Sequence, residues 1–377
     1  MTKKEKLNQE ELRRYARHLA LPGFGMEGQE KLKAGKALVI GAGGLGAPVL
    51  LYLAAAGVGH IGIVDFDQVE ETNLQRQVLY TIDDVGQLKA EAARRRLLAL
   101  NPHIKVETYP VAFTRDNALE IIAPYDVIID GTDNFPTRYL SNDACVLAGK
   151  PLVYGSIFRF EGQASVFNYP LPDGQRSPNY RGLFPTPPPP ELVPNCAEGG
   201  VLGVLPGIIG SIQANEAIKI LAGIGEPLAG KLLLFDAATL TTRILKLPPG
   251  AGPGITELID YEQFCAPAPP SPVKEASVQE LQALMAEQAD FQLIDVREPY
   301  EYGIANLGGE LIPPNEILAA ADRIAHDKMV ILYCRSGKRS AEAIRQLQKH
   351  TGQGNLYNLR GGILAWAREI DPSMKQY

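Results

Sequence analysis

The order of apolar and polar positions predicts alternating strands and helices in the first part of the chain. Residues 36–40 form a short apolar run, followed by a glycine-rich turn over 41–46, an apolar helix over 45–56 and a second apolar run over 60–64. The alternation continues with a helix over 87–100, a strand over 103–108, a helix near Asn117 and a strand over 126–130. This order is typical of a mostly parallel sheet covered on both faces. We therefore predict a doubly wound, Rossmann-like α/β fold.

Further segments extend this domain at both ends. Asn8 and Glu11 have the spacing of a helix capping box. The positions after them make one apolar stripe, formed by Leu12, Tyr15, Ala16 and Leu19. Toward the other end, the pattern predicts an apolar helix over 201–221 and strands over 231–235 and 242–247.

Two proline-rich segments indicate the domain organisation. Residues 174–194 include Pro185 and Pro187–Pro190, which exclude a helix or a central strand and predict an exposed loop. Residues 266–276 are rich in proline and poor in apolar anchors, as in a semi-rigid linker. The predicted domains are therefore 1–265 and a smaller one over 277–377.

The composition restricts the classes of partner. The chain has 377 residues, 45% of them hydrophobic, and a formal net charge of −6, which suits a globular protein and argues against a sequence-independent binder of nucleic acid. Its four cysteines are widely scattered, so we expect reduced thiols in the cytoplasm. The N-terminus is too charged for a signal peptide, and the longest apolar stretch, 45–59, is shorter than the roughly 20 residues of a membrane span. We expect a soluble protein.

The glycine-rich turn is a candidate phosphate site. Gly41, Gly43 and Gly46 have the G-x-G-x-x-G spacing between a strand and a helix, where backbone N–H groups and the helix N-terminus hold phosphate oxygens. Asp65 ends the next strand, where an acidic side chain accepts hydrogen bonds from a ribose. These residues alone fit an NAD-dependent oxidoreductase, a nucleotidyl site or a purely structural turn.

Residues further along favour nucleotidyl chemistry over redox chemistry. They are Asp67, Asn73, Arg76, Gln77, Lys89 and the segment G-T-D-N-F-P-T-R over 131–138. Hydride transfer needs an apolar nicotinamide slot, whereas Arg76 and Lys89 supply positive charge suited to a triphosphate. Asp133 follows a strand at the edge where parallel sheets bind ligands, and a carboxylate there suits Mg²⁺. Each residue alone fits a solvated surface charge, but their joint order favours one site.

These motifs resemble the MoeB/ThiF family, relatives of the ubiquitin-activating enzymes. The resemblance rests on G-A-G-G-L-G, Asp65, N-L-Q-R-Q, Lys89 and D-N-x-x-T-R, and it extends to about Cys265. It implies an adenylyltransferase that uses ATP and Mg²⁺ to activate the C-terminal Gly-Gly carboxylate of a small ubiquitin-like sulfur-carrier protein. The implied ATP-binding residues are Gly41, Gly43, Gly44, Gly46, Asp65, Asp67, Asn73, Arg76, Gln77, Lys89, Asp133 and Asn134. Among these, Arg76, Lys89 and Asp133 are implied to be catalytic, Asp133 through Mg²⁺. The resemblance also implies a homodimer in which Arg17 reaches across to the other subunit's site.

A cysteine marks a second candidate site. Residues 328–333 predict a buried strand, and C-R-S-G-K-R-S over 334–340 follows it directly and leads into a helix. Converging backbone N–H groups and three nearby cations, Arg335, Lys338 and Arg339, favour a thiolate nucleophile at Cys334. Four residues separate Cys334 from Arg339, one fewer than in Cys-based phosphatases, which favours a terminal sulfur over a phosphate. The alternative is a cysteine that is merely buried.

The last hundred residues resemble rhodanese domains. F-Q-L-I-D-V-R-E-P-Y-E-Y over 291–302 resembles their first signature and 334–340 their active loop, and the resemblance covers most of 277–375. It implies that Cys334 is catalytic and carries a persulfide, which a donor such as a cysteine desulfurase would supply. The implied persulfide loop is Cys334, Arg335, Ser336, Gly337, Lys338 and Arg339, whose charged members stabilise the anionic sulfur.

The remaining cysteines give two further expectations. Cys196 follows the proline-rich loop, and the family resemblance implies a catalytic role for it, as an acyl acceptor or a disulfide-resolving thiol; the alternative is a small buried residue. Many members of the family hold a structural zinc with two C-x-x-C pairs. Here the first pair would fall on residues 179–182, N-Y-R-G, and the second leaves only Cys265. One cysteine cannot supply four zinc ligands, so we predict no zinc.

The predicted enzyme therefore works in two steps. ATP adenylates the carrier's carboxylate, and persulfide sulfur then displaces AMP and leaves a thiocarboxylate. The alternatives are an NAD-dependent oxidoreductase, a ubiquitin-type activator that passes its cargo as a thioester on Cys196, and a non-enzymatic scaffold. The residues do not select among carriers of the molybdopterin, thiamine, cysteine and tRNA-thiolation pathways.

Overall fold

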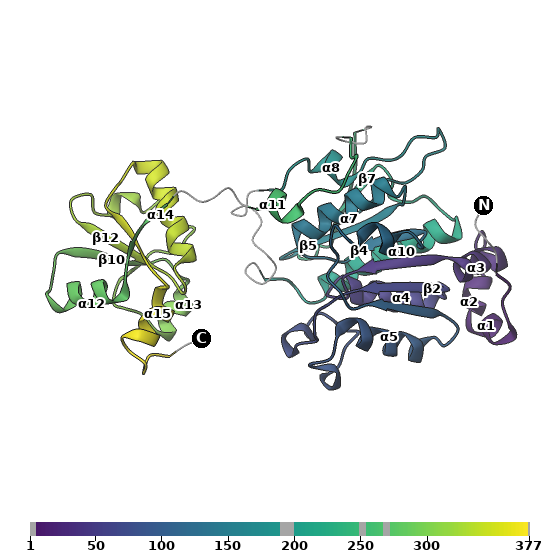
Figure 1. The fold of residues 1–377 in the computed structure, drawn as a ribbon, viewed down its shortest axis with the longest axis horizontal. Coiled ribbons are helices and arrows are strands. Elements are labelled where there is room, and N and C mark those ends of the chain that lie inside the picture. Colours follow the sequence, from purple (N-terminus) through teal and green to yellow (C-terminus); the bar gives the residue numbers. More distant parts are fainter. Residues whose placement is uncertain (1–4, 189–199, 249–253, 267–271, 376–377) are drawn as a thin grey trace. The chain divides into compact units, whose positions relative to one another are not determined.

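The chain divides into two compact units, Met1–Pro267 and Ala268–Tyr377. The computed structural model describes residues 5–188, 200–248, 254–266 and 272–375 (Figure 1). Each unit has its own sheet and hydrophobic core. Of the segment predicted as a linker, residues 267–271 lie outside the described residues, whereas Lys274–Ala276 form a strand in the sheet of the second unit.

The first unit is built on an eight-stranded sheet with the order β3-β2-β1-β4-β5-β6-β7-β8. The strands are β1 (Lys36–Ile40), β2 (His60–Val64), β3 (Lys105–Tyr109), β4 (Val127–Asp130), β5 (Leu152–Phe158), β6 (Glu161–Phe167), β7 (Lys231–Asp236) and β8 (Thr241–Lys246). Pairing is parallel from β3 to β5 and antiparallel from β5 to β8. The chain order reverses between β1 and β4, which is where open parallel sheets bind ligands at their carboxyl edge.

Helices cover both faces of this sheet, as predicted. They are α1 (Gln9–Arg14), α2 (Ala16–Leu19), α3 (Gly25–Ala34), α4 (Gly46–Ala56), α5 (Lys89–Leu100), α6 (Ala118–Ile122), α7 (Phe135–Leu147), α8 (Tyr180–Leu183), α10 (Leu205–Ala222) and α11 (Tyr261–Cys265), with 3-10 turns at Glu71–Asn73 and Ile82–Asp84. One core cluster includes α4, α5 and α10, and another includes α6 and α7. None of the helices in the described ranges combines the length and apolar character needed to cross a membrane.

The predicted N-terminal helix is split in two. Asn8 and Glu11 form the expected capping box, but α1 ends before Tyr15, and α2 begins after it. The Tyr15 side chain is buried, and its hydroxyl accepts a hydrogen bond from Asn101 Nδ2 at 2.8 Å. Tyr15 thus lies at the break and contacts a residue 86 positions away, which local helix periodicity does not encode.

The second unit has a parallel five-stranded sheet with the order β11-β10-β12-β13-β9. The strands are β9 (Lys274–Ala276), β10 (Phe291–Asp295), β11 (Glu310–Leu311), β12 (Met329–Tyr333) and β13 (Leu356–Leu359). The helices are α12 (Val278–Ala286), α13 (Pro299–Ile304), α14 (Lys338–Thr351) and α15 (Gly362–Glu369), with a 3-10 turn at Ala321–Arg323. Two core clusters occupy the two faces, so this unit is a smaller α/β domain.

A fully buried ion pair fixes the carboxyl end of β10 in this second unit. Arg297 Nε donates to Asp295 Oδ1 at 2.8 Å, and Arg297 Nη2 donates to Asp295 Oδ2 at 2.5 Å. Neither side chain is exposed, and Arg297 Nη2 also donates to the Ala305 carbonyl at 2.7 Å. The D-V-R part of the first rhodanese-like signature is therefore a structural clamp.

We predict that Asp295→Ala destabilises the second unit by about 3 kcal/mol or more, because it leaves the Arg297 charge buried without its partner. Asp290→Ala is the matched control, since Asp290 pairs with Lys328 on the surface. Calorimetric unfolding of the full chain checks this. Equal effects of the two substitutions would contradict a structural role for the Asp295–Arg297 pair.

Candidate functional site

The first candidate site begins at the glycine-rich turn between β1 and α4. Gly41 has a φ of +88°, a conformation that favours glycine. A Cβ on Gly46 would lie 1.9 Å from the Gly41 carbonyl oxygen, and a Cβ on Gly131 would lie 2.7 Å from the same atom. The backbones that follow β1 and β4 therefore approach each other as only glycines allow. This close approach places the turn at the carboxyl edge of the sheet.

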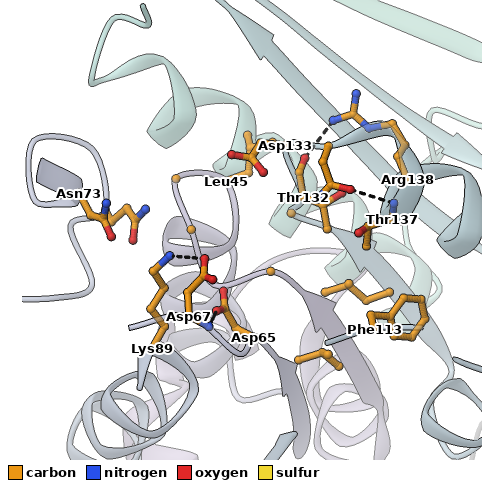
Figure 2. A pocket seen from close by; sticks show the side chains of 18 of the residues that line it. Leu45, Asp65, Asp67, Asn73, Lys89, Phe113, Thr132, Asp133, Thr137 and Arg138 are labelled. Atoms are coloured by element: carbon orange, nitrogen blue, oxygen red, sulfur yellow. Dashed lines mark hydrogen bonds and ion pairs between the residues drawn. The ribbon is translucent and has the colours of Figure 1, made fainter. Parts of the chain in front are cut away.

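A cavity of about 630 Å³ opens over this edge, and Figure 2 shows its lining side chains. Nearly all of the residues predicted to bind ATP line it, namely Gly41, Gly43, Gly44, Asp65, Asp67, Asn73, Arg76, Gln77, Lys89, Asp133 and Asn134. Gly46 lies just behind the turn and does not line the cavity. The lining therefore combines the glycine backbone, carboxylates and three cationic residues, Arg76, Lys89 and Arg138, in one space.

Asp65 is held at the end of β2 by the turn itself. Its Oδ2 accepts from the Ala42 backbone N–H at 2.8 Å, and its Oδ1 accepts from the Asp67 backbone N–H at 2.9 Å. Burial raises the pKa of Asp65, while these N–H groups and the nearby Lys89 charge oppose the rise. Each oxygen has one donor and a further lone pair, so the carboxylate is fixed in place yet still able to accept hydrogen bonds from a ligand.

The two cations predicted to bind ATP, Arg76 and Lys89, have different partners. Lys89 Nζ is 2.9 Å from Asp67 Oδ2, and the lysine is almost fully buried (Figure 2). Arg76 donates to the Thr72 carbonyl at 3.1 Å, and its Cδ would lie 3.8 Å from a Cβ on Gly44. Because Lys89 already has a carboxylate partner in the chain, its charge is partly balanced until an anionic ligand competes for it.

Two buried amide residues complete this wall of the cavity. Asn73 Oδ1 accepts from the Glu70 backbone N–H at 3.2 Å, which fixes the 3-10 turn. Gln77 is 3% exposed, and its Oε1 has no hydrogen-bond partner among the described residues. An unpaired buried carbonyl oxygen next to a polar cavity suits contact with a donor from a ligand or water.

Asp133 projects from the turn after β4 and is exposed to the cavity. It forms no hydrogen bond or ion pair with any other residue that the structure describes. The turn beneath it is rigid, because Asp130 Oδ1 accepts from the Thr132 N–H at 2.9 Å and Arg138 Nη2 donates to the Thr132 carbonyl at 3.0 Å. Arg138 is buried, and sequence reasoning did not assign it this positioning role.

One of the predicted site residues lies away from this cavity, and another lies outside the described residues. Arg17 is exposed on α2 and does not line the cavity of its own chain. Cys196 lies outside the described residues, so its expected role stays a prediction. Cys145 is buried in α7, and burial raises the pKa of its thiol far above the ordinary range, as expected for a structural cysteine.

The second candidate site is the loop between β12 and α14. Cys334 is 1% exposed, and its Sγ accepts from the Gly337 backbone N–H at 3.2 Å and from the Ser340 hydroxyl at 3.4 Å. Gly337 has a φ of +90°, and a Cβ on Gly362 would lie 2.4 Å from the Cys334 carbonyl oxygen. The loop therefore wraps tightly around the sulfur and turns hydrogen-bond donors toward it.

The cations of this loop do not share one environment. Arg335 and Lys338 are exposed. Arg339 instead donates from both terminal nitrogens to the two carboxylate oxygens of Glu301, each at 2.7 Å. Glu301 is 3% exposed on α13, so this pair ties the loop to the neighbouring helix. That Arg339 stabilises an anionic sulfur on Cys334 stays a prediction. The ion pair with Glu301 offsets part of the charge of its guanidinium group.

A buried ion-pair network braces the segments where the family resemblance places zinc ligands. Arg181 in α8 donates from Nε to Asp143 Oδ1 at 2.8 Å and from Nη2 to Asp143 Oδ2 at 2.7 Å. Tyr261 in α11 donates its hydroxyl to the same carboxylate at 2.8 Å, and the Arg181 guanidinium lies 4.4 Å from the Phe264 ring centroid. Burial opposes the charge on Arg181, but hydrogen bonds to Asp143 raise its pKa above the ordinary value. We call these four residues the Arg181 clamp.

The chain belongs to the ThiF family, because the ThiF family model matches residues 15–252. The model of the rhodanese-like domain matches residues 277–369. A ThiF domain joined to a rhodanese-like domain fits an adenylation step followed by a sulfur-transfer step.

Two of the relatives described below are named for both an adenylyltransferase and a sulfurtransferase activity, and a third for adenylyltransferase activity alone. The chain is 48% identical over 380 residues to the probable adenylyltransferase/sulfurtransferase MoeZ of Mycobacterium tuberculosis, covering 98% of this chain and 96% of the relative. It is 57% identical over 263 residues to the sulfur carrier protein adenylyltransferase of Thermus thermophilus, covering 68% of this chain and 97% of the relative. It is 43% identical to the adenylyltransferase and sulfurtransferase MOCS3 of Aedes aegypti over 99% of this chain and 90% of the relative.

Solved structures share the fold. A crystal structure of E. coli MccB with ATP aligns with a TM-score of 0.54 at 24% identity, covering 67% of this chain and 74% of that one. Together, the family and the relatives confirm the predicted class, an adenylyltransferase with a sulfurtransferase domain.

We predict that Arg181→Met destabilises the first unit by about 3 kcal/mol, because it leaves the Asp143 carboxylate buried without its cation. Tyr261→Phe removes one hydrogen bond to the same carboxylate and should cost about 1.5 kcal/mol or more. Unfolding of the full chain followed by calorimetry checks both values. If neither substitution moves the transition of the first unit, the clamp does not brace that unit.

Proposed function

We propose that this chain uses ATP to adenylate the C-terminal carboxylate of a small ubiquitin-like sulfur-carrier protein ending in Gly-Gly, and then transfers sulfur to it from a persulfide on Cys334. The observation that carries the proposal is the cavity at the carboxyl edge of the ThiF domain sheet, where the fixed Asp65 carboxylate, Arg76 and Lys89 line the same space as the glycine turn. The cysteine loop of the rhodanese-like domain supports the second step.

In this proposal, residues that line the cavity contact the phosphates and the ribose of ATP. The turn glycines leave room for phosphate oxygens to approach backbone N–H groups at the start of α4. Asp65 is fixed as an acceptor for the ribose hydroxyls. Arg76, Lys89 and Asn73 provide the donors for the polyphosphate, while Asp67, Gln77 and Asn134 complete the lining.

Asp133 is the residue proposed to hold Mg²⁺. Mg²⁺ prefers one or two carboxylates together with substrate phosphates and water. The Asp133 carboxylate lies at the cavity without a partner among the described residues, on a turn that Arg138 and Asp130 fix, so its chemistry and placement fit. When bound with ATP, the ion neutralises charge on the phosphates.

The first step needs alignment more than acid–base help. A C-terminal carboxylate has a pKa of about 3.5 and is already ionised at neutral pH. Its oxygen forms a bond to the α-phosphorus, the bond from that phosphorus to the bridging oxygen breaks, and pyrophosphate leaves. Arg76 and Lys89 stabilise the negative charge that develops on the phosphates.

The second step uses Cys334 charged with sulfur by a donor such as a cysteine desulfurase. The terminal persulfide sulfur bonds to the carrier's acyl carbon and AMP leaves, which gives an acyl disulfide. A second thiol, which we assign to Cys196, then bonds to Cys334 Sγ and releases the thiocarboxylate. A disulfide between the two cysteines results, and a cellular thiol must reduce it before the next cycle.

We also propose a homodimer in which Arg17 completes the cavity of the other subunit. The exposed position of Arg17, away from the cavity of its own chain, agrees with this assignment.

The Arg181 clamp replaces the structural zinc of other family members in this proposal. The described residues contain no group of three or more potential metal-binding side chains. Asn179, which stands where a cysteine ligand would, caps α8 by accepting from the Gly182 N–H at 3.2 Å. The clamp joins α8 to α11, the two segments that zinc would join.

We predict that Arg76→Ala and Lys89→Ala each reduce carrier-dependent exchange of pyrophosphate into ATP by about 10²- to 10⁵-fold, since each removes a cation from the developing phosphate charge. Arg94→Ala is the matched control, because Arg94 lies on α5 with Lys89 but does not line the cavity. Near-normal exchange in either site variant would refute the proposed nucleotide site.

We predict that Cys334→Ser abolishes sulfur transfer while pyrophosphate exchange stays normal, because the two reactions use different units of the chain. Incubation with thiosulfate or a cysteine desulfurase, followed by mass spectrometry of the protein, detects the persulfide. A transferable sulfur retained in the Cys334→Ser variant would count against Cys334 as the carrier.

We predict that the purified chain contains no stoichiometric zinc and that a strong chelator leaves its unfolding temperature unchanged. The reason is that the Arg181 clamp supplies the bracing without a metal. Elemental analysis that finds one zinc per chain would contradict this assignment.

A further inference from the structure

The sulfur of Cys334 belongs to a buried hydrogen-bond chain that the proposed reaction has not used. Ser340 Oγ lies 3.4 Å from Cys334 Sγ and 2.6 Å from Asn358 Oδ1. Ser340 is fully buried and Asn358 is 4% exposed, so water does not readily substitute for either partner. A serine hydroxyl has one proton, and it cannot serve both neighbours at once.

The fold holds these three side chains together from three different elements. Cys334 follows β12, Ser340 lies in the first turn of α14, and Asn358 lies near the end of β13. Gly337 adopts φ +90° beside Asn358, and a Cβ there would lie 3.4 Å from Asn358 Nδ2. The amide therefore stays next to the loop backbone within reach of Ser340.

We propose that Ser340 and Asn358 are positioning residues that form a reversible hydrogen-bond relay for Cys334. When the sulfur is a neutral thiol, its S–H donates to Ser340 Oγ, and the serine proton goes to Asn358 Oδ1. When the sulfur is a thiolate, the Ser340 proton turns to the sulfur, and the Asn358 amide rotates to donate an N–H to Ser340 Oγ. An amide suits this exchange because it offers both a donor and an acceptor end.

The relay rests on the proposed function in one respect, since a thiolate at Cys334 is the form that accepts sulfur from a donor. The other charges of this region include Arg335 and Lys338 on the loop and the Arg339–Glu301 and Asp295–Arg297 ion pairs. Glu275, Arg345 and Arg360 line a pocket together with Gly337 and Asn358. Both ion pairs are internally balanced. The relay therefore adds a neutral, switchable donor close to the sulfur.

Asn358→Asp tests the relay most directly, because a carboxylate has nearly the same shape but only accepts hydrogen bonds. It would hold the Ser340 proton away from the sulfur. We expect the thiolate absorbance of Cys334 at neutral pH, and the rate of its alkylation by iodoacetamide, to fall by about tenfold, as for the loss of one hydrogen bond to a charged group. Subtraction of the Cys334→Ser spectrum isolates the signal.

Three further variants of the full chain complete the test. Gln348→Glu introduces the same charge change two turns along α14 and should leave the absorbance unchanged. Ser340→Ala should lower the absorbance, whereas Ser340→Thr, which keeps a hydroxyl, should restore it. This serine pair decides the question even if Asn358→Asp does not fold.

Equal thiolate absorbance in Ser340→Ala and the unchanged chain, or equal losses in the alanine and threonine variants, would overturn the relay. These readouts need neither carrier nor ATP. If the variants behave as expected but Cys334 transfers no sulfur, the proposed function is refuted and the relay is not.

Discussion

The first candidate site depends on the close approach of the backbones that follow β1 and β4 at the glycine turn. A side chain on Gly46 or Gly131 would collide with the Gly41 carbonyl oxygen. Because this space must stay empty, both positions require glycine, and the turn residues Gly41, Gly43 and Gly44 line the cavity beside them. The placement of Asp65, whose carboxylate accepts from the Ala42 N–H within the turn, depends on the same geometry. The position of this cavity thus depends on a backbone requirement as well as on charged residues.

Charge in both sites is balanced by partners that the chain itself provides. Lys89 is paired with Asp67, and Arg339 is paired with Glu301. Such pairing keeps buried or half-buried cations compatible with folding, because a buried charge without a partner is costly. In the proposed ATP site, the phosphates would compete with Asp67 for Lys89. The Cys334 sulfur instead contacts neutral donors, the Gly337 N–H and the Ser340 hydroxyl.

The sequence predicts the fold class and most cavity residues because both follow from local patterns. The apolar runs, the glycine spacing and the residues that follow β2 and β4 can each be recognised within a short stretch of the sequence. What it missed depends on contacts between distant segments. The Arg181 clamp joins Asp143 to Tyr261 across 118 positions, and no spacing rule links them. Burial of Tyr15, which divides the N-terminal helix, depends likewise on Asn101. Cys196 stays a prediction, since it lies outside the described residues.

The central claim is that one carboxylate is first adenylated in the ThiF domain and then receives sulfur from Cys334. Mass spectrometry of candidate carrier proteins, incubated with the enzyme, ATP, Mg²⁺ and a sulfur donor, tests it most directly. The account predicts that one carrier gains the mass change of oxygen replaced by sulfur at its C-terminus, and that omission of ATP or the substitution Cys334→Ser abolishes this product. A thiocarboxylate that forms equally well with Cys334→Ser, or a carrier that stops at the adenylate with the intact enzyme, would contradict it.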